Sequence, residues 1–370
     1  MPRTTPSANR RRGVALTGSL TAALVLLAGC GSPSGGGGSE QADPDAFTVS
    51  LITPGAQGDN SYIDAAVRGL DAAEQSMGVT GQVIEAESTS RQESALRSAV
   101  TARPDLVLAL GLDPDSLRAV ADDNPDQRFG APSDVNMDEL PANVAAYTVN
   151  VHEGSFLAGV VAGSLTRTRT VGAVLGIDAP GLNQFFYGYK QGVLAACPGC
   201  TVVNSYLGGR FSDPALGKEA ALDQIQRGAD IVYGVAGLSG TGVIQAAQET
   251  GTFAIGVDGN QDDDAPGTVI TSVLKRVDRT TELLIEAAKN GTFRSGFTAV
   301  GLAQGATGLS WDDGSTTFAR TGPADLTAKL PQVRAAVADY KARILDGSIA
   351  VCDALGAPTT PQCRSLGVAA

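Results

Sequence analysis

The 370-residue chain has little of the histidine on which many hydrolases and zinc sites depend: His152 is the only one. No Ser/His/Asp catalytic set can form around it, and the sequence contains no nucleophile elbow. A zinc site would need further histidines or clustered cysteines. No apolar run after residue 30 is long enough to cross a membrane. We therefore expect no triad hydrolase, no zinc site and no membrane-spanning domain.

The first 29 residues have the pattern of an export signal, with Arg3 and arginines at 10–12 before an apolar stretch at 14–27. A short buried helix opening a domain is the alternative. It fits less well because charged residues flank the stretch on one side only. Residues 27–30, Leu-Ala-Gly-Cys, resemble the lipobox of bacterial lipoproteins. The resemblance implies cleavage before Cys30 and a lipid anchor on Cys30 at the outer face of the cell membrane.

Residues 30–45 are rich in Gly and Ser and have little apolar surface to bury, so we expect a flexible tether. The signal holds four arginines and no acidic residue. The mature chain therefore keeps 23 of the 27 basic residues and all 39 acidic ones, a formal net charge of −16. Such a chain is a poor partner for nucleic acid. About 325 residues follow the tether, more than one core usually holds, which favours two lobes.

Four cysteines remain once Cys30 carries lipid, and they form two pairs that are close in sequence: Cys197 with Cys200, and Cys352 with Cys363. An even number of cysteines outside the cytosol favours disulfides. A redox-active CxxC at 197–200 would need a thioredoxin-like βαβ setting. We expect a structural disulfide within each pair.

Short β-branched runs alternate with amphipathic segments of helix length along most of the chain. The predicted strands are 47–52, 82–85, 106–110, 170–175, 201–206, 231–235 and 253–257. The predicted helices are 61–77, 91–100, 153–165, 185–197, 213–227 and 241–250. This alternation predicts an α/β fold with parallel, doubly wound sheets.

Doubly wound sheets bind ligands at the carboxyl ends of their strands, where the loops diverge and helix N-termini point donors outward. We therefore expect the site among the loops that follow strands. These loops are rich in Gly, Asp and aromatic residues, and they cover 59–62, 111–113, 176–185, 208–213, 237–240 and 258–262.

Several short segments, taken together in their order and spacing, resemble the basic membrane protein family, the nucleoside-binding lipoproteins of ABC importers. They are DNSY at 59–62, NVHEGSFLAG at 150–159, FFYGY at 185–189, GRFSD at 209–213, GK at 217–218, GAD at 228–230, VAG at 235–237, GVD at 256–258 and SVLK at 272–275. The similarity runs from about Phe47 to Leu309. It implies a type I periplasmic-binding-protein-like fold, in which two doubly wound α/β lobes joined by a hinge close on a ligand without chemistry on it.

The resemblance also implies a domain organisation. After the signal at 1–29 and the tether at 30–45, lobe 1 covers 46–147 with a return at about 276–295, and lobe 2 covers 148–275 with about 296–370. The implied partners are a nucleoside and a membrane-embedded ABC permease, with no cofactor and no metal. The acidic run at 262–264 lacks the alternating oxygens, glycine and distant Glu of an EF-type loop, which favours a solvated loop.

In this family the cleft holds a purine between aromatic rings, while an Asp and a Lys contact the ribose. The carboxylate of Asp258 can accept hydrogen bonds from both hydroxyls of a cis diol, and Lys275 can donate to ribose oxygens. Gly237 lets the backbone approach a ligand closely. By resemblance, the expected ligand-binding residues are Asp59, Tyr62, Phe185, Phe211, Gly237, Asp258 and Lys275.

Plainer interpretations of the same residues stay open. Phe185 and Phe211 could be core residues, Asp258 could cap the following segment, and Lys275 could be a solvated charge. The protein could also be a receptor of the same fold for a sugar or a signalling molecule, which fold analogy does not separate from a nucleoside receptor. A nucleoside hydrolase is a further alternative, but the lack of a Ser/His/Asp set argues against it.

Overall fold

The computed structural model describes residues 46–57, 62–133 and 135–368, so the predictions for Cys30, Asp59, the signal and the tether lie outside the described residues. Within these ranges the strands form two six-stranded sheets. The first has the order β11-β5-β4-β3-β1-β2, and all its neighbouring pairs are parallel. Its strands are β1 (Phe47–Thr53), β2 (Val79–Glu85), β3 (Leu106–Ala109), β4 (Phe129–Ala131), β5 (Val144–Val149) and β11 (Gly296–Val300).

The second sheet has the order β12-β10-β9-β8-β6-β7, and its pairs are parallel except for β12, which runs antiparallel to β10. Its strands are β6 (Thr170–Leu175), β7 (Thr201–Tyr206), β8 (Ile231–Val235), β9 (Phe253–Asp258), β10 (Val269–Lys275) and β12 (Thr307–Leu309). All five residues of β8 are buried, as expected for a strand covered on both faces.

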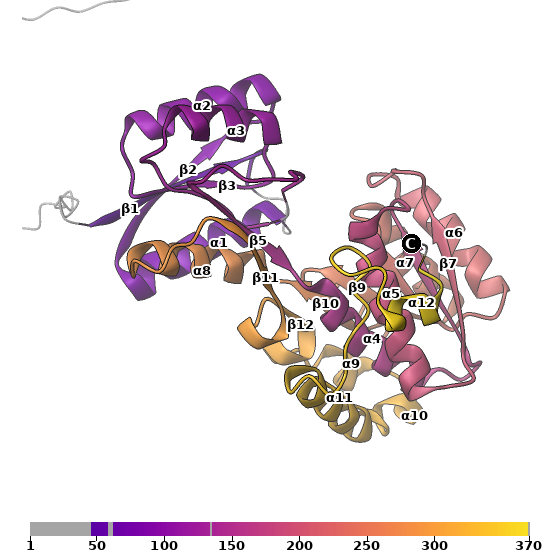
Figure 1. The fold of residues 1–370 in the computed structure, drawn as a ribbon. Coiled ribbons are helices and arrows are strands. Elements are labelled where there is room, and N and C mark those ends of the chain that lie inside the picture. Colours follow the sequence, from indigo (N-terminus) through magenta and orange to yellow (C-terminus); the bar gives the residue numbers. More distant parts are fainter. Residues whose placement is uncertain (1–45, 58–61, 134, 369–370) are drawn as a thin grey trace, which may run out of the picture. The chain divides into compact units, whose positions relative to one another are not determined.

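Helices cover both faces of each sheet (Figure 1). On the first sheet, α1 and α8 pack on one face and α2 and α3 on the other. On the second, Ile231 and Tyr233 of β8 point into the core formed with α4 and α5, whereas Val232 points into the core formed with α6 and α7. The helices are α1 (Tyr62–Met77), α2 (Thr89–Thr101), α3 (Pro114–Asp123), α4 (Val151–Leu165), α5 (Pro180–Ala196), α6 (Pro214–Gln226), α7 (Ser239–Thr250), α8 (Val277–Lys289), α9 (Thr317–Thr321), α10 (Ala324–Thr327), α11 (Leu330–Leu345) and α12 (Pro361–Leu366), with 3-10 turns η1 (Leu302–Gln304) and η2 (Ser310–Asp313).

The predicted α/β fold with two doubly wound sheets is confirmed, and β6, β7 and β8 have the predicted bounds. Helix α5 begins at Pro180, earlier than the predicted 185, because proline is well tolerated in the first turn of a helix. Alternation of strands and helices did not predict β5 or β10, since each follows another strand with no helix between them.

The chain crosses from one sheet to the other three times: after β5, after β10 and after β11. Strand β11 pairs with β5, with Val300 opposite Val149, so residues 296–300 belong to the first sheet. The sequence placed them in lobe 2. Val300 is the only fully buried residue of this edge strand, so its hydrophobic pattern is too weak to assign it to a sheet.

Both expected pairs of cysteines are bonded in the structure, Cys197 to Cys200 and Cys352 to Cys363. The second bond lies within residues 350–368, which we call the C-terminal clip. The clip packs on α5: the Lys190 ammonium donates to the Leu366 carbonyl at 2.8 Å, and Gln191 exchanges hydrogen bonds with the backbone of Ala350 and Cys352. Among the described residues, no helix combines the length and the apolar character that a membrane span requires.

Candidate functional site

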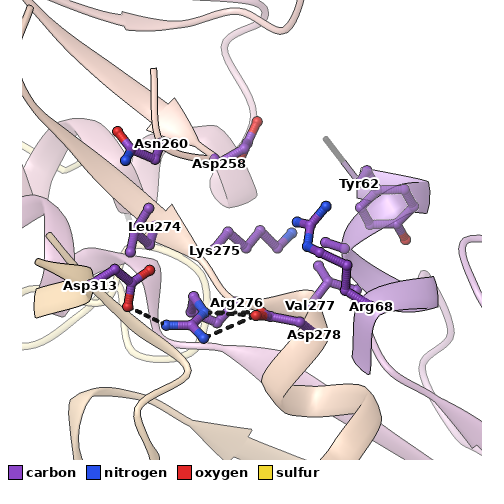
Figure 2. Close-up of a pocket in the computed structure, with 12 residues that line it drawn as sticks. Tyr62, Arg68, Asp258, Asn260, Leu274, Lys275, Arg276, Val277, Asp278 and Asp313 are labelled. Carbon is purple, nitrogen blue, oxygen red and sulfur yellow. Dashed lines mark hydrogen bonds and ion pairs between the residues drawn. The ribbon is translucent and has the colours of Figure 1, made fainter. Parts of the chain in front are cut away.

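A cavity of about 380 Å³ lies where the crossing after β10 meets α1 and the end of β9 (Figure 2). Helix α1 packs on the first sheet, while β9 and β10 belong to the second, so elements of both sheets line it. Half of its lining residues are charged, and we call it the charged cavity. The lining residues are Tyr62, Ala65, Arg68, Asp258, Gly259, Asn260, Leu274, Lys275, Arg276, Val277, Asp278 and Asp313.

Asp258 ends β9 with a backbone φ of 65°, in the left-handed region that Asp tolerates better than most residues. Burial raises the pKa of its carboxyl, and the positive charge of Lys275 partly offsets the rise. Such a carboxylate gains from any group that donates hydrogen bonds to it, because those bonds replace lost water. Asp258 is therefore suited to bind hydroxyl groups of a ligand.

Arg276 lies at the crossing itself and is held by two carboxylates. Its Nε and Nη2 donate to Asp278 at 3.0 and 2.9 Å, and its Nη1 donates to Asp313 at 2.8 Å. The hydrogen bonds that Arg276 donates to Asp278 and the nearby negative charges raise the pKa of Arg276 against the effect of burial. Arg276 thus joins the start of α8 to η2 across the floor of the charged cavity and has few donors left for a ligand.

Helix α1 contributes an aromatic ring and a cation to the charged cavity. The ring of Tyr62 lies against Gly111, whose φ is 55°, and a Cβ at Gly111 would lie 2.8 Å from the Tyr62 hydroxyl. A side chain at Gly111 would therefore displace the tyrosine. Arg68 lies on the same helix and is exposed, and Figure 2 shows Lys275 extending across the cavity toward it.

A second cavity, of about 230 Å³, shares Asp258 and Lys275 with the charged cavity. Its other walls are mostly apolar, and two phenylalanines lie among them, so we call it the aromatic cavity. Phe185 is buried within α5, whereas Phe211 is 39% exposed. The lining residues are Val151, Gly181, Leu182, Gln184, Phe185, Phe211, Val235, Gly237, Asp258 and Lys275.

Two glycines make room for Phe211. A Cβ at Gly176 would collide with the Phe211 ring, and a Cβ at Gly237 would lie 3.2 Å from the Phe211 carbonyl oxygen. Gly237 also has a φ of 55°, which a side chain would strain. The Ser239 N–H donates to the Phe211 carbonyl at 3.0 Å, which ties the loop to the start of α7. The phenylalanine backbone is therefore held in place while part of its ring stays open.

Gln184 is a polar residue in the wall of the aromatic cavity, next to Phe185. Its side chain is only 6% exposed, and its Nε2 donates to the Asp353 carboxylate of the C-terminal clip at 2.5 Å. A segment far away in the sequence thus holds a polar group at the wall of the cavity.

The acidic run at 262–264 differs from the solvated loop expected there, because Asp262 is fully buried. Its carboxylate accepts hydrogen bonds from the hydroxyls of Ser272, Ser310 and Ser315 at 2.8, 2.7 and 2.5 Å. These bonds fasten the β9–β10 loop, which carries Asn260, to β10 and η2. In the part of the chain that the structure describes, no three His, Cys, Asp or Glu side chains are placed to hold a metal ion.

The structure places six of the seven expected ligand residues around these two cavities, and Asp59 lies outside the described residues. Sequence reasoning missed the polar residues that only packing brings to the cavities, namely Arg68, Gln184, Arg276, Asp278 and Asp313. Arg276 could have been suspected, because it directly follows the SVLK segment. Arg68 and Gln184 carry no local signal, since a polar residue on a helix is usually solvated.

Comparisons with known proteins agree with this architecture. The model of a family described as ABC transporter substrate-binding protein PnrA-like matches residues 46–321. Basic membrane protein A of Borreliella afzelii is 32% identical over 284 residues, which cover 75% of this chain and 86% of that protein.

Solved structures lead to the same group. An ABC transporter solute-binding protein from Aeropyrum pernix is 29% identical with a TM-score of 0.65, covering 82% of this chain and 92% of that one. An ABC transporter solute-binding protein from Conexibacter woesei is 26% identical with a TM-score of 0.66, and the match covers 84% of this chain and 99% of that one. These neighbours confirm the type I periplasmic-binding fold and the resemblance seen in the sequence. With three quarters of its length matched, the chain belongs to the PnrA-like, basic membrane protein family of ABC transporter substrate-binding proteins.

Proposed function

We propose that this substrate-binding protein captures a ribonucleoside for its ABC transporter. The observation that carries the proposal is that the charged and aromatic cavities share one acid and one base, Asp258 and Lys275. A nucleoside likewise has a polar part and an aromatic part, because a hydroxyl-rich sugar is joined to a flat nucleobase. The ribose would lie at the shared Asp258 and Lys275, and the base would extend toward Phe211.

The sugar end is supported by the chemistry of Asp258. A carboxylate has acceptor sites for both hydroxyls of a cis diol, and a buried one loses free energy when no donor faces it. Lys275 carries a complementary donor for the ring and hydroxyl oxygens. A pentose could use the same pair, so the sugar end alone does not distinguish the two ligand classes.

The aromatic cavity favours a nucleoside over a pentose. Phe211 keeps 39% of its surface exposed although it is large and apolar, and exposed phenylalanine surface is unfavourable unless something covers it. A nucleobase stacked on an aromatic side chain gains about 1–3 kcal/mol. A pentose ring is saturated and has no π face, so it can offer the phenylalanine only C–H contacts of smaller area.

The proposal describes capture without chemistry. Substrate-binding proteins of ABC transporters work on the extracytoplasmic side of the membrane and pass their solute to a permease, which we propose as the protein partner here. The lipid anchor on Cys30 is part of the same proposal, because a tethered receptor stays near its permease. Changing Cys30→Ser should release the protein or leave it unprocessed, as measured by fractionation; detergent-requiring membrane retention of a correctly cut variant would contradict the anchor.

Calorimetry with the purified protein tests the ligand class. Adenosine, guanosine, their 2′-deoxy forms, nucleotides and free ribose form the ligand panel. We expect ribonucleosides to bind most tightly and to be recovered unchanged after overnight incubation. Tight binding of ribose with no response to any nucleoside would refute the proposal, and conversion of the nucleoside to free base would indicate a hydrolase instead.

A further inference from the structure

The amide of Gln184 has a fixed direction in the wall of the aromatic cavity. Its Nε2 donates to Asp353 Oδ1 at 2.5 Å. A carboxylate only accepts hydrogen bonds, so Asp353 selects the nitrogen side of the amide and turns the carbonyl oxygen away from itself. Among the described residues, no group donates a hydrogen bond to Gln184 Oε1, and this oxygen is not fully buried. The oxygen is therefore an accessible acceptor on a residue that lines the cavity.

The C-terminal clip holds Asp353 rigidly in its charged form. Besides Gln184, the carboxylate accepts the N–H groups of Leu355 and Gly356 at 3.0 and 2.8 Å. Burial alone would raise the pKa of Asp353, but the hydrogen bonds from Gly356 and Gln184 and the nearby His152 lower it below its usual value. The neighbouring Cys352 is bonded to Cys363, which closes the clip. Asp353 is thus an ionised acceptor at neutral pH.

The residue that orients Gln184 belongs to the C-terminal clip, which lies outside the part of the chain that the family model matches. The family match ends at residue 321, whereas the clip covers 350–368. A segment beyond the matched region therefore orients a group in the wall of the aromatic cavity.

We propose that Gln184 is a specificity-determining residue whose Oε1 accepts a hydrogen bond from an amino group on the edge of the base, and that Asp353 is its positioning residue. The ligand class is a purine nucleoside that carries an exocyclic amine. This inference rests on the proposed nucleoside-binding function. Gln184 directly precedes Phe185 on α5, so a base stacked near the phenylalanines would bring its edge to the amide.

The test compares matched ligands that differ by one amine: adenosine with purine riboside, and guanosine with inosine. Calorimetry on the wild-type protein should show a preference of roughly tenfold for the amine in at least one pair. Gln184→Met keeps the size but removes the acceptor, and should reduce that preference to about twofold or less. Asp353→Asn can donate to Gln184 Oε1, which frees the amide to turn, and should also reduce the preference.

Gln191→Met is the matched control. Gln191 lies on the same helix and binds the same clip, but it does not line the aromatic cavity. It should lower stability while leaving the amine preference unchanged. Loss of the preference in Gln191→Met, or its persistence in Gln184→Met, would overturn the inference, as would equal binding within both pairs by the wild type. In those outcomes nucleosides still bind and the proposed function stands; absence of any nucleoside binding would instead refute both.

Discussion

The charged cavity and the aromatic cavity share Asp258 and Lys275 but differ in the rest of their walls. In the charged cavity Arg276 is occupied by Asp278 and Asp313, so much of the charge serves the crossing between the sheets. In the aromatic cavity the walls are apolar, and the single amide, Gln184, is held from outside by Asp353. The comparison shows that three of the six charged residues of the charged cavity, Arg276, Asp278 and Asp313, bind one another at the crossing. We therefore expect ligand selectivity to depend on the few polar groups outside that network.

Removing the shared acid should have the largest effect on binding. Asp258→Ala should weaken ribonucleoside binding by roughly 50-fold, about 2–3 kcal/mol, because both sugar hydroxyls lose their charged acceptor. The variant should bind ribose and 2′-deoxyribose forms nearly equally. Calorimetry with a ribonucleoside and its 2′-deoxy form measures the two dissociation constants.

Asp313→Asn is the control for this prediction, since Asp313 lines the same cavity but binds Arg276. Asp313→Asn should still bind ribonucleosides more tightly than their 2′-deoxy forms. If Asp258→Ala kept that preference as well, Asp258 would not be the ribose acceptor.

Removing the Phe211 ring from the aromatic cavity should affect the binding of nucleosides but not of sugars. Phe211→Ala should weaken nucleoside binding roughly tenfold through lost stacking and leave ribose binding unchanged. Leu238→Ala serves as the matched control, because Leu238 is 58% exposed, lies on the neighbouring loop and lines neither cavity. Equal losses for nucleoside and ribose in Phe211→Ala would indicate a general packing defect instead of stacking.

Low pH should weaken ligand binding by protonating Asp258, the carboxylate that the two cavities share. The pKa of Asp258 lies above its ordinary value of 3.8, mainly because of burial. If the ligand needs the ionised form, affinity is constant at higher pH and falls up to about tenfold per pH unit once pH drops below that raised pKa. Calorimetry across this range should show the decline, and Asp258→Asn should remove it. An unchanged pH profile in Asp258→Asn would assign the titration to another group.

Opening the clip should have the smallest effect on binding. Replacing Cys352 and Cys363 by Ser should lower stability by about 3 kcal/mol and nucleoside affinity only a few-fold, because Asp353 loses its support. The matched pair Cys197 and Cys200 spans 3 residues instead of 11, so its loss should cost less, about 2 kcal/mol, and leave affinity unchanged. Urea unfolding and calorimetry measure both effects. Equal changes in affinity would show that the clip has no specific link to the aromatic cavity.

Strands β6, β7 and β8 could be predicted residue by residue, because each is a short segment rich in β-branched residues between two helices. Tyr62, Phe211 and Asp258 could be predicted to line the cavities, because each lies at or near a loop that follows a strand. Strand β11 could not be assigned, since only Val300 in it is fully buried. Asp262 looked like a solvated acid until three serine hydroxyls, distant in the sequence, were found around it.

The sequence by itself determined the alternation of strands and helices, the family and the residue types at the strand ends, since these depend on local periodicity and short motifs. Only the tertiary structure decided which polar side chains work together. Arg276 meets Asp313, and Gln184 meets Asp353, across separations of 37 and 169 residues. Such pairs follow from how helices and loops pack on the sheets, and no local propensity encodes the direction of an amide that a distant carboxylate selects.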